Sequence, residues 1–159
     1  MHDEESVRPK PLGNDLDREV VGTGGVRWTV RQLRERVSLP EPRVVLYREI
    51  ASGSPETLQI VGQTIEELVL GLDAYAIVID LADAADSSTS GEYRRFIPDF
   101  FKGLNRRAGG ALRQVAVVFY GNPVLRIVTK FLVGRMIDIP FSIHSSRAQA
   151  LHSARQALP

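Results

Sequence analysis

A chain of 159 residues is long enough to form one domain with its own hydrophobic core. Apolar residues make up 43% of it and charged residues 25%, and the formal net charge is +1, so no overall charge draws it to nucleic acid or to an acidic membrane. The chain contains no cysteine, which excludes disulfides, thiolate catalysis and cysteine-ligated metals.

The first 18 residues carry acidic residues, Pro and Gly, with almost nothing to bury. They predict a flexible leader followed by a single domain over 19–159. The start of the chain lacks the apolar stretch of a signal peptide, and the longest apolar runs are too short to span a bilayer. We therefore expect a cytoplasmic protein with no membrane span.

The first half of the domain predicts a hairpin, a strand and a helix. In EVVGTGGVRWTVR (19–31), two β-prone runs flank a glycine-rich turn, as in a hairpin. The run at 43–50, preceded by Pro40 and Pro42, is typical of a strand. Ser54-Pro55 predicts a helix start. A single apolar stripe of that helix follows at spacings of three and four: Leu58, Val61, Ile65, Leu68 and Leu72.

Strands and helices alternate in the second half. Buried strands are predicted over 74–82 and 113–120, and an edge strand, which contains Pro140, over 136–143. Helices are predicted over 90–107, with a kink at Pro98, after Asn122-Pro123, and over 146–157. Ser146 and Gln149 have the spacing of a capping box. This alternation predicts an α/β fold: a mixed, mainly parallel sheet of four to six strands with about four helices, after a short N-terminal hairpin.

The buried strands and the helical faces give a predicted core. Its members are large apolar residues on the inner positions of those elements: Val78, Ile79, Phe96, Phe100, Val117, Val118, Ile127 and Phe131.

No set of residues predicts catalysis or metal binding. Gly22 to Gly25 lack the Lys-Ser or Lys-Thr and the strand-to-helix context of a phosphate loop. His2, His144 and His152 are too few and too scattered for a metal site. The serines lack a nucleophile-elbow pattern. We expect a non-enzymatic protein without catalytic residues, metal or cofactor.

Three carboxylates, Asp80, Asp83 and Asp86, lie at and beyond the end of the strand 74–82, where ligands and partners of parallel sheets usually bind. A phospho-accepting receiver domain also has an aspartate there. That class, however, needs an acidic pair after its first strand, where this chain has Arg48-Glu49, and a lysine after a late strand, where it has Gly121-Asn122. The receiver interpretation is therefore the weaker one.

The run Asp86-Ser87-Ser88-Thr89-Ser90-Gly91 stands between a buried strand and a helix. Thr89 and Glu92 alone fit a capping box. A strand ending in Asp-Leu, a Ser-rich turn with Gly and a following helix also resemble the STAS domain of anti-sigma-factor antagonists, whose turn reads Asp-Ser-Ser-Gly or Asp-Ser-Thr-Gly.

The resemblance implies a hydroxyl regulated by phosphorylation. If the family motif is aligned without gaps from Asp80, Thr89 occupies the position of the regulated hydroxyl. If the motif is aligned from Asp86 instead, Ser87 occupies that position. Ser88 is the third candidate. It also implies a partner-binding surface formed by the residues around that turn: Asp83, Asp86, Ser90, Gly91 and Glu92.

The segment 113–151 is similar to the closing half of the STAS and SpoIIAA-like group. Both have a strand, a helix, a short strand and a helix that begins with Ser-Arg-x-x-Ala-Leu. The resemblance covers about 26–158 and is weaker before residue 74. It implies a STAS-like domain that acts as a regulatory protein-interaction module and binds a protein partner, such as an anti-sigma kinase. A second copy of the chain is a further candidate partner. Two alternatives stay open: a SpoIIAA-like or Sec14-type binding domain for a small apolar or lipid ligand, and a structural or assembly subunit.

Overall fold

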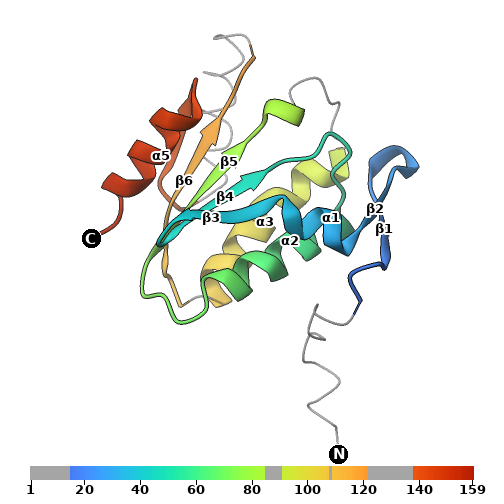
Figure 1. The fold of residues 1–159 in the computed structure, drawn as a ribbon. Helices are drawn as coiled ribbons and strands as arrows, with labels where there is room; N and C mark the ends of the chain where they lie inside the picture. Colours follow the sequence, from blue (N-terminus) through green and yellow to red (C-terminus); the bar gives the residue numbers. More distant parts are fainter. Residues whose placement is uncertain (1–14, 85–90, 108, 122–137) are drawn as a thin grey trace, which may run out of the picture.

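The computed structural model describes residues 15–84, 91–107, 109–121 and 138–159 (Figure 1). The described strands form a two-stranded sheet, β1-β2, and a five-stranded sheet in the order β3-β4-β5-β6-β7. The strands are β1 (Glu19–Val21), β2 (Arg27–Thr29), β3 (Val37–Glu41), β4 (Val44–Arg48), β5 (Tyr75–Asp80), β6 (Leu112–Val118) and β7 (Phe141–His144). The helices are α1 (Val30–Glu35), α2 (Pro55–Leu68), α3 (Gly91–Arg107) and α5 (Arg147–Gln156), with short 3-10 turns η3 (Thr23–Gly25) and η4 (Ala82–Ala84).

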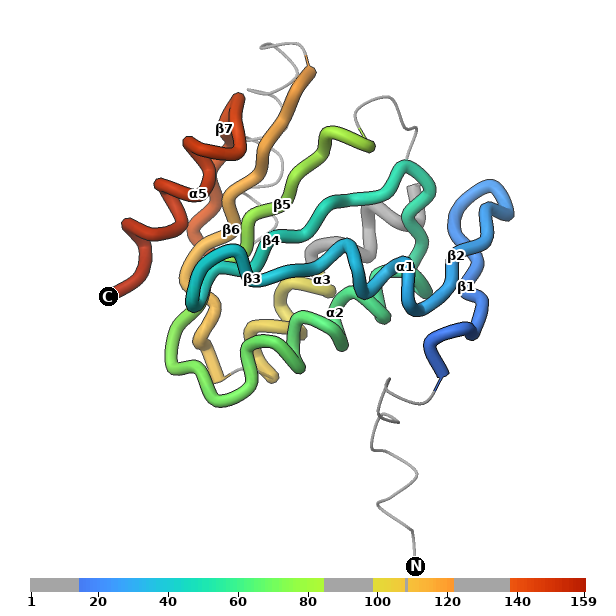
Figure 2. Tube along the Cα trace, in the orientation of Figure 1, coloured from blue at the N-terminus to red at the C-terminus, as the bar shows by residue number. Residues whose placement is uncertain are grey.

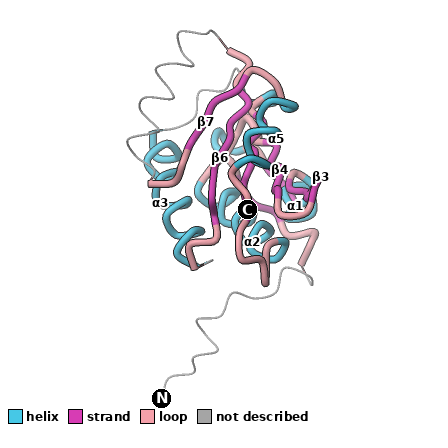
Figure 3. The backbone as a smooth tube through the Cα atoms, turned by 90° about the vertical axis from the view of Figure 1, so that its left-hand side faces the viewer, coloured by secondary structure: helices cyan, strands magenta, loops and turns pink. Residues whose placement is uncertain are grey.

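The main sheet is mixed and mostly parallel, as the sequence predicts. β3 runs antiparallel to β4, and β4, β5, β6 and β7 run parallel to one another. Helix α2 connects β4 to β5, and α3 connects β5 to β6. Both lie on one side of the sheet, and α5 lies on the other (Figures 1 and 3).

The two faces of the sheet bury two apolar clusters, because successive side chains of a strand point to opposite faces. The cluster under α2 and α3 takes strand residues such as Val45, Ile77, Ile79, Val115 and Val117. The cluster under α5 takes the intervening ones, Val44, Leu46, Ala76, Val78, Ala116 and Val118, with Ala150 and Ala154 from the helix.

The predicted core is confirmed where the structure describes it. Val78, Ile79, Phe100, Val117 and Val118 are all buried. The side chains of Phe96, Ile127 and Phe131 lie outside the described residues, as do the helix predicted after Asn122-Pro123 and residues 136 and 137 of the strand predicted over 136–143. That strand begins later than predicted, at Phe141, directly after Pro140.

The caps agree with the sequence in one helix and differ in another. Ser54 begins α2 with a full capping box, in which its side chain bonds the Thr57 N–H and the Thr57 hydroxyl bonds the Ser54 N–H. Ser146 likewise accepts from the Gln149 N–H at the start of α5. The Gln149 side chain, however, accepts from the Ser145 hydroxyl instead of closing the predicted box.

The N-terminal hairpin is confirmed, but its second strand ends earlier than expected. β2 stops at Thr29, whose side chain begins α1 through a capping box with Gln32. Neither α1 nor β3 was predicted from the sequence. Of the leader predicted over 1–18, the structure describes residues 15–18, where Leu16 packs against the cluster formed by β1, α1 and α2 and its carbonyl accepts from the Arg31 N–H.

The connections around the hairpin place it beside the loop that follows β4. Thr23 donates from its N–H to the Ser52 carbonyl (2.8 Å), and the Trp28 indole N–H donates to the Ser52 hydroxyl (2.9 Å). Figure 2 follows the chain through this region, from β1 and β2 through α1 into β3. In the described part of the chain, none of the helices combines the length and apolarity that crossing a membrane requires.

Candidate functional site at the carboxyl edge of the sheet

Parallel strands end at the same edge of a sheet, and this edge gathers the candidate site. Asp80 is the last residue of β5, Tyr120 follows β6, and Arg147 opens α5 just after β7. The order of the strands in the sheet makes β5, β6 and β7 neighbours, so three residues far apart in the chain meet at one place.

The Asp80 carboxylate is at the centre of this group. The residue is only 2% exposed. Its Oδ1 accepts from the Ala82 N–H at 2.9 Å. Its Oδ2 accepts from Arg147 through Nε at 3.0 Å and Nη2 at 2.9 Å, and from the Tyr120 hydroxyl at 3.3 Å. A buried carboxylate with this many donors is a structural anchor, and it lacks the exposure that a phosphate-accepting aspartate needs.

Two partners of Asp80 remain half exposed. The Arg147 side chain is 48% exposed and Tyr120 is 49% exposed. Partial burial raises the pKa of the Tyr120 hydroxyl, and the negative charge of Asp80 and the hydrogen bond to it raise that pKa further. Tyr120 therefore remains a neutral donor to Asp80 at physiological pH.

Asp83 lies on η4, three residues after Asp80, the last residue of β5. It is paired with Arg36, whose Nη1 is 2.5 Å from its Oδ2. The Arg36 guanidinium lies 5.7 Å from the centroid of the Trp28 ring. Arg36 thereby joins the N-terminal hairpin to the connection that leaves β5.

The end of β4 adds a further buried acidic group. Glu49 is 8% exposed, and its Oε1 accepts from the Tyr47 hydroxyl (2.6 Å) and the Ile50 N–H (3.1 Å). The Glu49 N–H donates to the Asp80 carbonyl at 3.0 Å, so the loops after β4 and β5 begin from a common, fixed point.

A polar cluster lies between β6, β7 and α5. Gln114 donates to the hydroxyls of Ser142 (3.1 Å) and Ser153 (2.9 Å), and the Nε2 of His144 is 2.8 Å from the Ser142 hydroxyl. His144 and Ser153 also line an open groove of about 500 Å³ along α5. His144 and His152, two of the three histidines in the sequence, line this groove, and among the described residues no third metal-ligating side chain joins them in a cluster.

The structure places few of the predicted site residues. Asp83 is exposed at the edge, as described. Gly91 is the first residue of α3, and Glu92 follows it in the helix. The phosphorylation candidates Thr89, Ser87 and Ser88, together with Asp86 and Ser90, lie outside the described residues.

Sequence reasoning missed Arg36, Tyr120 and Arg147. Tyr120 and Arg147 each carried a signal that could have been used, because Tyr120 ends the predicted strand 113–120 and Arg147 lies at the start of the predicted helix 146–157. Arg36 carried none, since α1 itself was not predicted.

Comparison with known proteins gives a fold but no family. No family model matches the chain, and a search of curated proteins finds no match. A solved structure with a similar fold is the NMR structure of the protein TM1081: it has a TM-score of 0.50 and 17% sequence identity, and the match covers 76% of this chain and 87% of that one. At this identity the likeness concerns the fold alone.

Proposed function

We propose that this chain is a non-enzymatic regulatory module of the STAS, anti-sigma-factor-antagonist-like type, which binds a protein partner through the carboxyl edge of its sheet. Phosphorylation of the turn 86–91, at Thr89 or else at Ser87 or Ser88, would regulate that binding. The motif around this turn and the order of the elements support the proposal.

The observation that carries it is the pair of half-exposed side chains held by Asp80. Tyrosine and arginine contribute strongly to protein interfaces, above all when they are already held in place before binding. Tyr120 and Arg147 are fixed by one buried carboxylate and keep about half of their surface free. A partner that covers them would gain contacts without having to immobilise them first.

The turn 86–91 begins two residues after η4, where the exposed Asp83 lies. A phosphoryl group in the turn adds about −1.5 to −2 charges at neutral pH. Together with Asp83 and Asp86 it would repel a partner with an acidic contact surface, and it would also increase the desolvation cost of covering the edge. Regulation in this form does not require the domain to unfold.

The first experiment tests the surface. Tagged wild-type chain, Tyr120→Ala and Leu70→Ala would be used in parallel to capture proteins from the cells that make the chain, with quantitative mass spectrometry as the readout. Leu70 is the matched control, because it is 86% exposed but lies in the turn before β5, at the opposite edge of the sheet. The proposal expects a protein retained by wild type and Leu70→Ala and lost by Tyr120→Ala. Equal retention by all three chains would refute this surface.

The second experiment tests the switch with the partner so identified. Thr89→Glu should weaken its binding by about tenfold or more, and Thr89→Ala should bind like wild type. Leu70→Glu, in the exposed turn before β5 at the opposite edge of the sheet, adds the same charge and should leave affinity unchanged. If Thr89→Glu binds like wild type and both Thr89 variants alter only the melting temperature, the hydroxyl is a helix cap and not a switch.

A further inference from the structure

The outer edge of β1 has unpaired backbone groups. The Val30 N–H donates to the Arg18 carbonyl (3.0 Å), and the Gly22 N–H donates to the Val26 carbonyl (2.7 Å). In an antiparallel pair, hydrogen-bonded and non-hydrogen-bonded positions alternate. The backbone groups of Glu19 and Val21, which lie between Arg18, Val20 and Gly22, are therefore directed away from β2.

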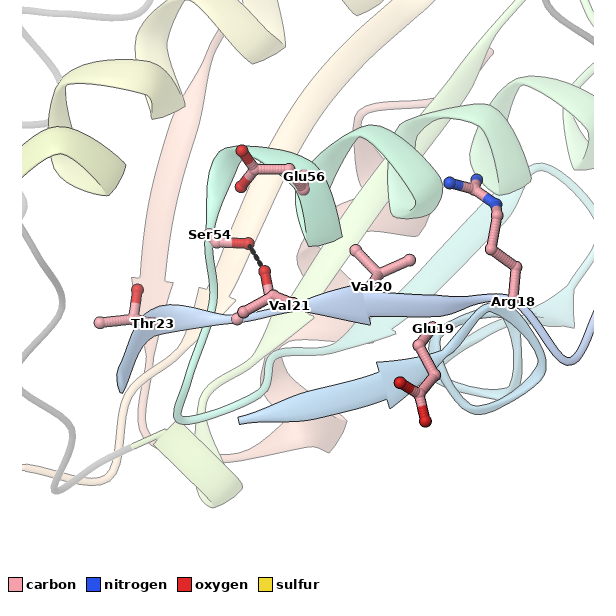
Figure 4. A pocket seen from close by; sticks show the side chains of 8 residues that line it. Arg18, Glu19, Val20, Val21, Thr23, Ser54 and Glu56 are labelled. Atoms are coloured by element: carbon pink, nitrogen blue, oxygen red, sulfur yellow. Dashed lines mark hydrogen bonds between the residues drawn. The ribbon is translucent and has the colours of Figure 1, made fainter. Parts of the chain in front are cut away.

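One of these outward groups already has a partner. The Val21 carbonyl accepts from the Ser54 hydroxyl at 2.8 Å, as Figure 4 shows. Within the part of the chain that the structure describes, the N–H groups of Glu19 and Val21 have no acceptor. Val21 is also 52% exposed, which is high for a valine in a strand.

A groove of about 510 Å³ runs along this edge. It is lined by every residue from Arg18 to Thr23 on one side and by Ser54 and Glu56, at the start of α2, on the other (Figure 4). The groove is therefore as long as β1 itself, and Glu19 and Val21, whose N–H groups are directed away from β2, are among the residues that line it.

We propose that this groove binds an extended segment of a protein partner, which adds to β1 as a third strand of the small sheet. An unpaired strand edge is a template for strand addition, in which the main chain supplies affinity and alternate side chains supply specificity. The inference goes beyond the function proposed above, because it concerns β1 and not the carboxyl edge, and it stands independently of any phosphorylation.

Charge and exposure define the chemistry of the segment. Arg18 is paired with Asp15, and Glu19 is paired with Arg27. Glu56 forms no ion pair with any described residue, so the unmatched charge in the groove is negative. The segment should carry a small or β-branched apolar residue opposite Val21 and a lysine or arginine that reaches Glu56.

Amide hydrogen exchange of the full chain tests the geometry first. The amides of Val20 and Gly22 point toward β2 and should exchange slowly, whereas those of Glu19 and Val21 should exchange fast. Slow exchange of Glu19 and Val21 in the chain alone would show that the edge is already paired, and would overturn the proposal.

A random peptide library displayed on phage, selected against the full chain, supplies the probe. A selected and then synthesised peptide should protect the Glu19 and Val21 amides and should be extended and basic. Val21→Pro removes the N–H of Val21 that is directed away from β2, and it breaks no hydrogen bond between β1 and β2. Proline is tolerated at such an edge position. Val21→Pro should lower the affinity for the peptide by about tenfold or more. Val26→Ala shortens the other exposed valine of the hairpin and should leave that affinity unchanged.

Glu56→Gln keeps the size and exposure of the side chain and provides a variant that does not depend on proline. Glu56→Gln should lower the affinity for the peptide by about twofold to fivefold. A library that yields no binder protecting Glu19 and Val21 would overturn the proposal. So would peptides that bind Val21→Pro and Glu56→Gln as tightly as wild type.

Discussion

The guanidinium of Arg147 donates through Nε (3.0 Å) and Nη2 (2.9 Å) to one oxygen of Asp80, a residue 67 positions earlier in the chain. The contact joins the end of β5 to the first residue of α5. Because Ala150 and Ala154 of α5 close the second core cluster, the same contact fixes how that helix lies on the sheet.

Asp80→Ala should lower the free energy of unfolding by about 2–4 kcal/mol. The substitution removes a buried acceptor of several hydrogen bonds and leaves Ala82, Tyr120 and Arg147 without their partner. Urea unfolding would measure the change. Arg113→Ala, which removes an exposed arginine of β6, should change stability by less than about 0.5 kcal/mol. Equal losses in the two variants would contradict the role of Asp80.

Two helical glycines should respond in opposite ways to alanine. A Cβ at Gly62, on α2, would lie 2.7 Å from the Phe100 ring of α3, which is itself buried. Gly62→Ala should therefore cost about 1–3 kcal/mol, although alanine favours a helix. A Cβ at Gly103 would meet only the flexible end of the Arg107 side chain, at 3.0 Å. Gly103→Ala should be neutral, or should stabilise by up to about 1 kcal/mol. A gain in thermal stability for both variants would show that α2 and α3 pack less closely here.

In the second half of the fold, β5, α3 and β6 could be predicted because these elements are long and strongly patterned. The uninterrupted apolar runs in β5 and β6 mark strands that are covered on both faces. The first half contains shorter elements. Pro40 and Pro42 precede the strand predicted over 43–50, and no strand was predicted there. The structure nevertheless includes Pro40 in β3, since an edge strand has N–H groups that need no partner.

The candidate site was predictable in part, for a physical reason. Asp80 and Asp83 are visible at the end of a patterned strand. Their partners are set by tertiary structure: Tyr120 is 40 positions from Asp80, and Arg36 is 47 positions from Asp83. Such pairings depend on the order of the strands and on α1, which the pattern of apolar residues did not reveal.

Tyr75→Phe should not destabilise the folded protein near neutral pH, and should stabilise it by up to about 1 kcal/mol. The Tyr75 side chain is fully buried, and among the described residues its hydroxyl has no hydrogen-bond partner. Removing an unsatisfied buried hydroxyl recovers its desolvation cost. Thermal unfolding would measure the change, with Tyr120→Phe as the comparison, since that variant loses the bond to Asp80.

The same tyrosine predicts a stability loss in strong base. Burial, and then the negative charge of Glu66, raise the pKa of Tyr75 to about 12, while Arg107 opposes them. In the unfolded chain the pKa is about 10. Below pH 10 the Tyr75 hydroxyl keeps its proton in both the folded and the unfolded chain, so its contribution to the free energy of unfolding is fully present. Above pH 10 the hydroxyl ionises first in the unfolded chain, and stability falls as the pH rises toward 12. The loss is on the order of 2–3 kcal/mol. Tyr75→Phe should lack this part of the pH dependence, and an unchanged slope between pH 10 and 12 would contradict the assignment.

Arg36 should control the environment of Trp28 without contributing much to stability. Trp28 is the only tryptophan in the sequence, so intrinsic fluorescence reports on it alone. Arg36→Gln removes the cation 5.7 Å from the ring centroid and the pair with Asp83. Because Asp83 is 58% exposed, the loss of unfolding free energy should stay below about 1 kcal/mol. The emission intensity of Trp28 should nevertheless change clearly.

Arg34→Gln is the matched control for this prediction. Arg34 belongs to the same helix α1, and its Nη2 lies 2.7 Å from Glu67 of α2, so its removal also breaks an ion pair. Arg34→Gln should leave the Trp28 emission as in wild type. Asp83→Asn keeps the Arg36 cation and should give a smaller change than Arg36→Gln. Since the Asp83 contact orients the guanidinium over the ring, adding Asp83→Asn to Arg36→Gln should have little further effect. The same emission change in Arg34→Gln and Arg36→Gln would mean that α1 has loosened as a whole, and the specific link from the hairpin through Arg36 to the end of β5 would then be wrong.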